Sequence, residues 1–461
     1  MTPERSAKND VTVTIIGGGL AGSEAAYQLA RRGAKVRLFE MRPKAFTPAH
    51  KTSKLAELVC SNSLGSDMLS NPAGILKAEM RKLDSLILAC ADRHKVPAGW
   101  ALAVDREAFS EEVTSTIRSM PSIEVVTEEA THLSEGPAII ASGPLTSTAL
   151  ASCLKDMLGE DFLYFYDAVA PVVLRETINM GVAFFGSRYG YGEDYINCPM
   201  NEEEYERFYE ALVNAEVAMR HDFEEEHFFE GCLPVEVIAK RGRDALRFGP
   251  MRPVGLADPK TGREPYAVVQ LRQDDRYGRL YNMVGFQTNL KWSEQDRVFR
   301  LIPGLEEAEF ARYGVMHRNI YVNAPAVLDE WLRIKGFDDI FMAGQIVGVE
   351  GYIESTAMGL VAALNLFCVI NGLPLLSWPR NTAIGSLLWY MKNANPSGFQ
   401  PMNINLGLFP PLPKKIKDKR KRCELIAGKA LSELEAFMKA RQDVSRMCFV
   451  KASCNLANRL S

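Results

Sequence analysis

The sequence predicts an α/β protein in which a large α+β domain is inserted into a nucleotide-binding domain, and three observations carry this prediction. A β-branched run, Val11 to Ile16, leads into the glycine-rich segment Gly17 to Gly22, which opens a helical pattern. The next strand candidate, Lys35 to Phe39, ends in the acid Glu40. A last strand and an apolar helix follow far downstream, between residues 339 and 371. This order of elements is typical of a Rossmann-like fold.

Each glycine of the first turn has an expected task. Gly17 would allow a tight turn, Gly19 would let the backbone approach a pyrophosphate, and Gly22 would let the helix pack closely on the strand. The helix N-terminus would offer free N–H groups to the phosphates, and Glu40 would accept hydrogen bonds from the ribose hydroxyls. The expected nucleotide-binding residues in this segment are Gly17, Gly18, Gly19, Leu20, Ala21, Gly22 and Glu40.

The downstream elements indicate which dinucleotide binds. Two short strand candidates, residues 123–126 and 138–141, precede the insertion, and Asp339 to Ala343 then predicts a returning strand before a helix from about Glu354 to Asn371. This wiring is usual in two-domain flavoproteins of the glutathione-reductase type. There the flavin ring lies beside the N-terminus of the returning helix, whose dipole stabilises negative charge on the reduced ring. We therefore expect FAD rather than NAD as the tightly bound cofactor.

The pattern of elements divides the chain into four parts. We expect residues 1–150 to form the first part of the FAD-binding domain and residues 336–413 its returning part. Residues 151–335 would form a separate domain that faces the substrate, and residues 414–461 a basic C-terminal segment. The inserted part contains aromatic-rich strand candidates, a β-rich run, and an acidic helix candidate over residues 202–229.

Composition restricts the class of protein. The chain has 461 residues, of which 47% are hydrophobic and 24% charged, as in an ordinary globular protein of two or three domains. Nine cysteines without a CxxC pair or a Cys/His ligand spacing argue against a disulfide framework or a metal site and favour a reducing cytoplasm. The polar N-terminus predicts no signal peptide, and the apolar stretch 357–370 predicts a buried helix rather than a membrane span.

The cysteines differ in their surroundings. Cys60 and Cys232 have polar or Gly/Pro-rich flanks, which predict shaped loops rather than core, but reactivity also requires an accessible, electropositive site. We expect the remaining cysteines to be buried packing residues or incidental members of the C-terminal tail; the first group is Cys90, Cys153, Cys198 and Cys368, and the second is Cys423, Cys448 and Cys454.

Charge is distributed unevenly. The whole chain has a net charge of −3, but residues 414–461 hold 13 Lys or Arg and 5 Asp or Glu, a net of +8, which leaves −11 for the rest. The basic run is either a solvated helix start or a contact with nucleic-acid phosphates. The candidate RNA-binding residues are Lys414, Lys415, Lys417, Lys419, Arg420, Lys421, Arg422 and, in the insertion, Arg252.

Several blocks of the sequence resemble one family closely. GGGLAGSEAA, LAELVCSNSL, ALAVDREAFSEEV, FFEGCLPVEVIA and FMAGQIVGVEGYIESTAMGL are similar to the folate- and flavin-dependent tRNA (uracil-5-)-methyltransferases, from about Val11 to beyond Pro413. Related flavoproteins that modify the wobble uridine share the glycine turn, but the CSNSL and EGCLP blocks together are not expected in them. The resemblance implies that 5,10-methylenetetrahydrofolate and reduced FAD are used to make 5-methyluridine in the T loop of tRNA, with NADPH or NADH as the reductant.

The resemblance also implies residue roles. Carbon 5 of uracil becomes nucleophilic only after a group adds at carbon 6, and a thiolate suits that addition. Matched onto this chain, Cys232 would be the nucleophile, and Cys60 would help to remove the carbon 5 proton or handle the methylene carrier; the reverse arrangement stays open. The segment expected along the isoalloxazine contains Gly344, Gln345, Glu350, Gly351 and Tyr352.

Some alternatives stay open at the level of sequence. The same chemistry on a ribosomal RNA uridine, or a mainly non-catalytic RNA-binding flavoprotein, would fit these motifs; a simple NAD(P)H–flavin oxidoreductase is disfavoured because it needs no second reactive cysteine. Many members of the family carry Arg after CSNSL, where this chain has Gly65. The arginines around the EGCLP block would contact tRNA phosphates or the folate tail, or pair with Glu236 or Asp244; they are Arg241, Arg243, Arg247 and Arg252.

Overall fold

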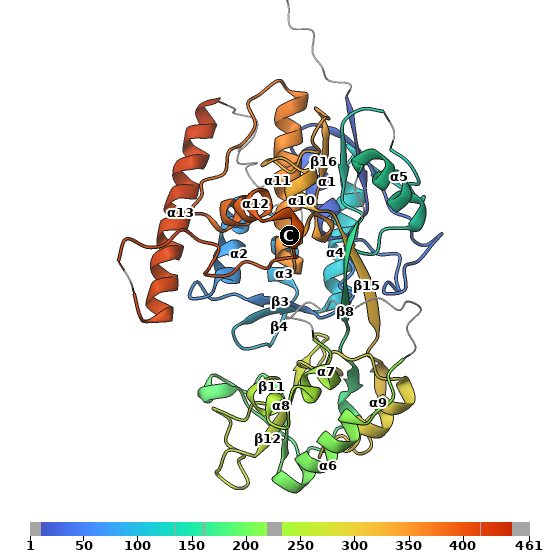
Figure 1. Cartoon of the computed structure of the whole chain (residues 1–461), viewed down its shortest axis with the longest axis vertical. Coiled ribbons are helices and arrows are strands. Elements are labelled where there is room, and N and C mark those ends of the chain that lie inside the picture. Colours follow the sequence, from blue (N-terminus) through green and yellow to red (C-terminus); the bar gives the residue numbers. More distant parts are fainter. Residues whose placement is uncertain (1–10, 134, 160–161, 219–232, 415, 445–461) are drawn as a thin grey trace, which may run out of the picture.

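The first domain is built on a parallel sheet, as the sequence predicts. The computed structural model describes residues 11–133, 135–159, 162–218, 233–414 and 416–444 (Figure 1). Five parallel strands pair in the order β16-β7-β1-β2-β6. Their bounds are β1 Thr12–Ile16, β2 Lys35–Phe39, β6 Ile123–Val126, β7 Ala138–Ile140 and β16 Ile340–Met342. Because β16 pairs with β7, the chain returns to this sheet after the insertion, which confirms the predicted wiring.

Two helices cross at the centre of this domain. Helix α1 (Leu20–Ala30) follows the glycine turn, and α11 (Tyr352–Ile370) is the returning helix, two residues longer at its start than predicted. A Cβ added at Gly359 would lie 2.2 Å from the Ala21 carbonyl oxygen, so glycine permits their close approach. Helix α11 is long and apolar enough to cross a membrane, but 83% of its most apolar window is buried inside the protein. The prediction of a buried core helix is confirmed.

The remaining elements of the first domain surround this core. A small antiparallel sheet has the order β3-β5-β4 and follows the loop that carries Cys60. Its strands are β3 Ser63–Ser66, β4 Lys95–Val96 and β5 Ala101–Val104; the helices are α2 Pro72–Lys82, α3 Leu86–Arg93, α4 Arg106–Ser119, α5 Thr148–Leu158, α10 Ala324–Val327, α12 Ala383–Asn393 and α13 Lys419–Val444, with short 3-10 turns at Gln345–Val347 and Pro396–Gly398. Helix α13 packs along α2 at the edge of the domain (Figure 1).

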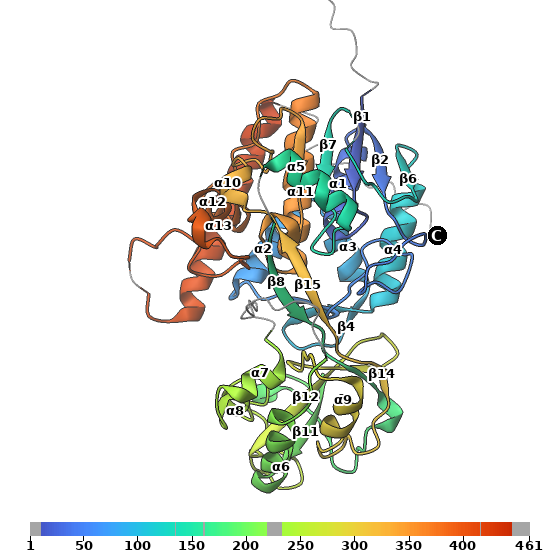
Figure 2. The same ribbon diagram turned by 45° about the vertical axis from the view of Figure 1, so that its right-hand side comes forward.

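A second domain lies beyond two long antiparallel strands, β8 (Leu163–Ala168) and β15 (Met316–Tyr321) (Figures 1 and 2). Its six-stranded antiparallel sheet has the order β10-β11-β12-β13-β9-β14. The strands are β9 Val172–Leu174, β10 Phe184–Phe185, β11 Tyr195–Met200, β12 Ala267–Gln273, β13 Leu280–Met283 and β14 Phe310–Arg312; the helices are α6 Glu202–Val213, α7 Val235–Lys240, α8 Ala245–Phe248 and α9 Trp292–Phe299, with 3-10 turns at Arg175–Thr177 and Arg188–Gly190. The core of this domain extends from Val173 to Phe310, whereas α5 and Tyr321 belong to the core of the first domain.

Two predictions about local structure were wrong. The acidic helix expected over residues 202–229 begins at Glu202 with a capping box between Asn201 and Glu204, but it ends at Val213. Val217 instead bridges to Leu290, which takes the chain out of the helix; residues 219–229 lie outside the described part of the chain. Cys423, expected to be an incidental tail residue, is completely buried, because α13 packs it against α2.

Candidate functional site

The glycine turn forms one wall of a pocket at the carboxyl ends of β1 and β2. The Gly18 N–H donates to Glu40 Oε2 at 3.1 Å, which fixes the turn to the second strand. Arg42 donates to both oxygens of Glu40, at 2.9 and 3.0 Å, and to Glu57 Oε2 at 2.8 Å. Burial opposes ionisation of Glu40, but the hydrogen bonds and charge of Arg42 outweigh it and lower the pKa of the carboxyl. Both Glu40 oxygens therefore already accept hydrogen bonds from the protein, and its contact with a ribose stays a prediction.

The glycines of the turn separate into two kinds. Gly17 has φ +104°, and a Cβ added at Gly22 would lie 1.8 Å from the Gly17 carbonyl oxygen. Both glycines are therefore required by the path of the backbone through the turn. A Cβ at Gly19 would meet nothing within 4 Å in the described structure, because Gly19 faces the open pocket. No side chain caps the N-terminus of α1. Free N–H groups beside an open glycine fit the pyrophosphate of a dinucleotide.

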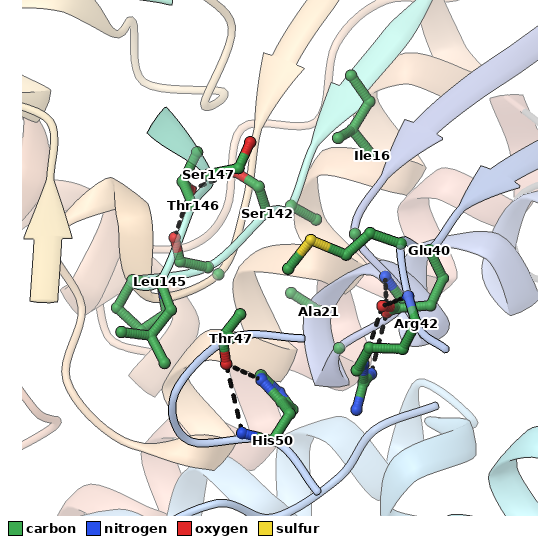
Figure 3. Close-up of a pocket in the computed structure, with 18 of the residues that line it drawn as sticks. Ile16, Ala21, Glu40, Arg42, Thr47, His50, Ser142, Leu145, Thr146 and Ser147 are labelled. Atoms are coloured by element: carbon green, nitrogen blue, oxygen red, sulfur yellow. Dashed lines mark hydrogen bonds and ion pairs between the residues drawn. The ribbon is translucent and has the colours of Figure 1, made fainter. Parts of the chain in front are cut away.

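The opposite wall of the pocket is polar. Figure 3 shows Ser142, Thr146 and Ser147 across the pocket from Glu40 and Arg42. Leu20, Ala21, Gly344, Gln345 and Tyr352 also line it. The structure therefore gathers the glycine turn and part of the returning segment around one elongated pocket, as the sequence predicted for a flavin dinucleotide.

A larger cavity of about 790 Å³ continues from this pocket. The two share a set of lining residues: Val59, Pro144, Leu145, Gln345 and Tyr352. Cys60, Glu350 and Gly351 line the larger cavity, and Gln345 Nε2 donates to Glu350 Oε2 at 2.7 Å. Cys60 thus lies where a second ligand would meet the end of a dinucleotide.

The backbone of Cys60 is held from both sides. The Tyr352 hydroxyl oxygen accepts hydrogen bonds from the N–H groups of Cys60, at 2.8 Å, and Ser61, at 3.2 Å. The Cys60 carbonyl oxygen accepts from Arg106 at 3.1 Å and from Arg312 at 3.4 Å. Burial raises the pKa of Tyr352 far above its ordinary value, so the phenol stays neutral. Tyr352 therefore positions the cysteine loop, a role that the sequence did not predict for it.

Three arginines surround the Cys60 loop, and we call them the arginine cluster: Arg106, Arg272 and Arg312. Arg272 is buried, and the other two are half-buried. Arg106 pairs with Asp274 at 2.9 Å, and Arg272 donates to Ser61 Oγ at 2.7 Å. Arg312 Nε is buried and has no hydrogen-bond partner among the described residues. Burial, and then the charge of Arg106, lower the pKa of Arg312 to about 10, so it remains charged at neutral pH. The cluster carries more positive charge than Asp274 balances, which favours an anion at this end of the cavity.

The cluster comes from both domains. Arg106 begins α4 in the first domain, whereas Arg272 lies on β12 and Arg312 on β14 in the second. Sequence analysis missed all three, because their meeting depends on how the domains pack. The one available signal was the ALAVDREAFSEEV block, which contains Arg106.

Another buried cation lies beneath the cavity, next to Gly65. Lys77 is fully buried and its Nζ donates to the carbonyl oxygens of Ser66 and Ala73, at 2.8 and 3.3 Å. Burial lowers the pKa of Lys77 to about 8. A Cβ added at Gly65 would lie 3.8 Å from this Nζ. Lys77 therefore places a cation beside Gly65, the residue that follows the CSNSL block.

The arginines of the insertion are mostly occupied by ion pairs. Arg247 pairs with Asp244 at 2.8 Å, as one of the alternatives expected, and Arg243 pairs with Glu202 at 3.1 Å and with Glu206. Pairing with Glu236 was wrong, because that carboxylate accepts from Thr288 and Asn289, both at 2.8 Å. The positive charge of Arg252 acts on the neighbouring Arg188.

The residues of the basic run that belong to α13 have different surroundings, because they lie on different faces of the helix. Lys419 and Arg422 on α13 line the larger cavity, whereas Arg420 pairs with Glu424 at 3.1 Å and Lys421 is exposed. Cys232 and Lys415 lie outside the described residues. Among the residues that the structure does describe, no cluster of His, Cys, Asp and Glu suits a metal ion.

Comparison with known proteins finds a matching family, close relatives in sequence and a solved structure of similar fold. The model of the glucose inhibited division protein A family matches residues 12–374. A methylenetetrahydrofolate--tRNA-(uracil-5-)-methyltransferase TrmFO of Pelotomaculum thermopropionicum is 59% identical over 428 residues, which are 92% of this chain and 98% of that protein. The protein of the same name from Moorella thermoacetica is 60% identical over 421 residues, 91% of this chain and 96% of that one. A solved structure of Aquifex aeolicus GidA has a TM-score of 0.66 at 15% identity, covers 95% of this chain and 78% of that one, and is similar in fold.

Proposed function

Because this chain belongs to the methylenetetrahydrofolate--tRNA-(uracil-5-)-methyltransferases, within the wider glucose inhibited division protein A family, we propose that it methylates carbon 5 of the T-loop uridine of tRNA. The enzyme is a folate- and FAD-dependent methyltransferase, and its product is 5-methyluridine. The observation that supports the proposal best is the position of Cys60, between the dinucleotide pocket and a second cavity large enough for a folate. A reaction that joins a flavin, a one-carbon carrier and a base requires such a junction.

The residues present fit FAD. The turn from Gly17 to Gly22 would hold the pyrophosphate on the N-terminus of α1, and Gly344, Gln345 and Tyr352 would lie along the ring. Reduced FAD, recharged by NADPH or NADH, supplies the two electrons that convert the transferred methylene to a methyl group. The dipole at the N-terminus of α11 favours negative charge in that part of the pocket.

Two cysteines would handle the base. We propose that the Cys232 thiolate adds to carbon 6 of uracil, so that an S–C6 bond forms and the electron pair moves to carbon 5 and oxygen 4. Carbon 5 then attacks the methylene group of the folate, the carbon–nitrogen bond of that group breaks so that tetrahydrofolate leaves with the electron pair, and the carbon 5 proton leaves to Cys60. Once the methylene carbon has gained the hydride equivalent that reduced FAD would supply, the S–C6 bond breaks and Cys232 is released as the thiolate. The arginine cluster supports the Cys60 role, because positive charge favours the anionic form that accepts a proton.

The target uridine would reach this cavity only after leaving its place in the T loop, since the base must contact buried groups. Flipping of this kind costs a few kcal/mol, which protein–phosphate contacts offset. Exposed members of the basic run, above all Lys414, Lys417, Arg420 and Lys421, are the proposed phosphate contacts. The bacterial cytoplasm is the proposed compartment, because free tRNA and folate meet there.

The test combines activity with covalent trapping. FAD-loaded protein is given 5,10-methylenetetrahydrofolate, NADPH and a tRNA transcript, and nucleoside mass spectrometry measures 5-methyluridine. A transcript with the T-loop uridine replaced by cytidine, and a ribosomal RNA fragment, serve as controls. Methylation of the fragment alone would overturn the tRNA assignment. A tRNA carrying 5-fluorouridine should be trapped on Cys232, whereas an adduct on Cys60 would reverse the proposed roles.

A further inference from the structure

The larger cavity is lined on one wall by two cationic side chains of α13. Lys419 and Arg422 are three residues apart on α13, so they lie on the same face of that helix, and both line the cavity. The adjacent buried Cys423 has its Sγ 3.6 Å from the Leu69 carbonyl oxygen, which seats the start of α13 beside the start of α2. Ser70, Asn71 and their neighbours on α2 complete this wall.

Arg422 has unused hydrogen-bonding capacity on this wall. Its Nε is buried and has no hydrogen-bond partner in the described part of the chain. A buried donor without a partner costs free energy, and a ligand acceptor would remove that cost. Its neighbour Arg420, on a different face of α13, is instead paired with Glu424. The two arginines therefore differ in what they can offer an anion.

The N-terminus of α2 adds to the same preference. Helix α2 has 11 residues, begins after Asn71, and has no acid in its first turn. Asn71 already caps this end, because its side chain accepts from the Ala73 N–H at 3.0 Å, so the helix contributes its dipole and no free N–H group. The two cations, Lys419 and Arg422, therefore favour one or more carboxylates at this place.

The same cavity contains the catalytic cysteine. Cys60 and Glu350 line it, and each is hydrogen-bonded to a residue shared with the dinucleotide pocket, Cys60 to Tyr352 and Glu350 to Gln345. Folates are polar at both ends, with a flat pterin that carries the reacting carbon and a tail of γ-linked glutamates that carries the carboxylates. If the reacting end lies at Cys60, the carboxylates extend away from it, toward α13.

We propose that Lys419 and Arg422 bind the glutamate tail of the folate, and that the enzyme prefers polyglutamylated folates. This inference rests on the proposed function, since it takes 5,10-methylenetetrahydrofolate as the ligand of the cavity. Each added glutamate brings another carboxylate for such cations to bind. An RNA phosphate is the competing ligand for this wall, because Lys419 is exposed and Arg422 is half-buried, and the test below distinguishes the two ligands.

The test measures folate binding without RNA. Calorimetry compares tetrahydrofolate monoglutamate with tetrahydrofolate triglutamate on the FAD-loaded protein and on Arg422→Gln and Lys419→Gln. We expect the unmodified protein to bind the triglutamate more tightly, and each variant to weaken triglutamate binding roughly tenfold, the effect of losing one charge-assisted hydrogen bond. Lys429→Gln, an exposed lysine two turns further along α13, is the matched control and should bind both folates normally.

The possible results separate the two proposals. If both variants bind both folates like the unmodified protein, the tail site is wrong while the methyltransferase proposal stands. If the unmodified protein binds neither folate, the proposed function itself fails. Normal folate binding with weakened tRNA binding in the variants would instead make this wall a phosphate contact. Flavin content and melting temperature show whether each variant is folded. If Arg422→Gln does not fold, the comparison of the two folates is made on Lys419→Gln, because Lys419 is exposed.

Discussion

The dinucleotide pocket and the surroundings of Cys60 are adjacent, but they are stabilised in different ways. In the pocket, Arg42 lies between the carboxylates of Glu40 and Glu57, and all three come from one short stretch of chain. Around Cys60, the arginine cluster of Arg106, Arg272 and Arg312 has one paired carboxylate, Asp274, and its members come from two domains. The first site has two carboxylates for its one arginine and no excess positive charge, whereas the second has more arginines than carboxylates and can stabilise an anionic reacting group.

The largest expected effect is in the dinucleotide pocket, where two glycines of the same turn should differ in their effects on stability and FAD binding. Gly22→Ala places a methyl group 1.8 Å from the Gly17 carbonyl oxygen, so the strand and helix must separate, and we expect a loss of stability above about 4 kcal/mol, with loss of flavin. Gly19→Ala adds its methyl group to open space. We expect it to fold normally as apoprotein but to bind FAD weakly.

Melting curves of the apoproteins and flavin titration distinguish the two glycines. Equal melting temperatures for the two variants would mean that Gly22 is not a packing glycine. Normal FAD affinity in Gly19→Ala would remove Gly19 from the pyrophosphate site.

The second prediction tests whether the positive charge of the arginine cluster acts on the Cys60 thiol. Arg312→Met removes a cation whose side chain contacts the Cys60 carbonyl oxygen, so the thiolate form of Cys60 is favoured less. We expect alkylation of Cys60 by iodoacetamide at neutral pH to slow about tenfold, the effect of one nearby charge on a thiol. Peptide mass spectrometry measures the rate at this residue.

Arg279→Met is the matched control for that change. Arg279 is 74% exposed in its side chain and pairs with Asp275 on a turn of the second domain. Its removal should leave the alkylation rate unchanged. If both variants react at the same rate, the arginine cluster has no electrostatic role at Cys60.

The third prediction compares two buried carboxylates of the first domain by their pH dependence. Glu79 is fully buried and accepts hydrogen bonds from the N–H groups of Ala383 and Ile384, and burial raises its pKa to about 8. The folded state therefore holds this proton more tightly than the unfolded state, and the stability is present below pH 4.5 and lost as pH rises through 8. Glu40 has the opposite sign: Arg42 lowers its pKa, so its contribution is lost as pH falls below about 4.5.

Glu79→Gln tests this sign. The amide does not titrate, so the fall in melting temperature between pH 6 and pH 9 should be smaller in the variant by a few degrees. This corresponds to about 2 to 3 kcal/mol, because about two pH units of that interval lie below the folded pKa of about 8 and each is worth about 1.4 kcal/mol. Differential scanning calorimetry at the two pH values gives the comparison. An unchanged fall would show that Glu79 does not titrate in this range.

The smallest expected effect concerns the exposed side of the basic run. Lys421→Gln should reduce the slope of the logarithm of tRNA affinity against the logarithm of salt concentration by somewhat less than one, as for one lost phosphate contact. Binding titrations at several salt concentrations measure the slope. If the slope does not change, Lys421 is a solvated residue and the other interpretation of the run holds at this position.

The sequence predicted the first domain better than the second because its signals are local. The strands Lys35–Phe39 and Ile123–Val126 were predicted to the residue, and the returning strand and helix to within two residues. In the insertion, the predicted helix of residues 202–229 ends at Val213, because a long-range bridge between Val217 and Leu290 outweighs local helix propensity.

The sequence by itself determined the family, and it predicted the flavin-binding turn and a role for Cys60, because each of these depends on a contiguous block of residues. Only the tertiary structure decided what surrounds that cysteine. Arg106 and Arg312 are more than 200 positions apart in the chain and meet only because the two domains pack together. Likewise, the basic run is continuous in the sequence, but in the structure Lys419 and Arg422 line the cavity, whereas Lys421 does not. Electrostatic strength depends on burial and distance, and both are properties of the folded chain.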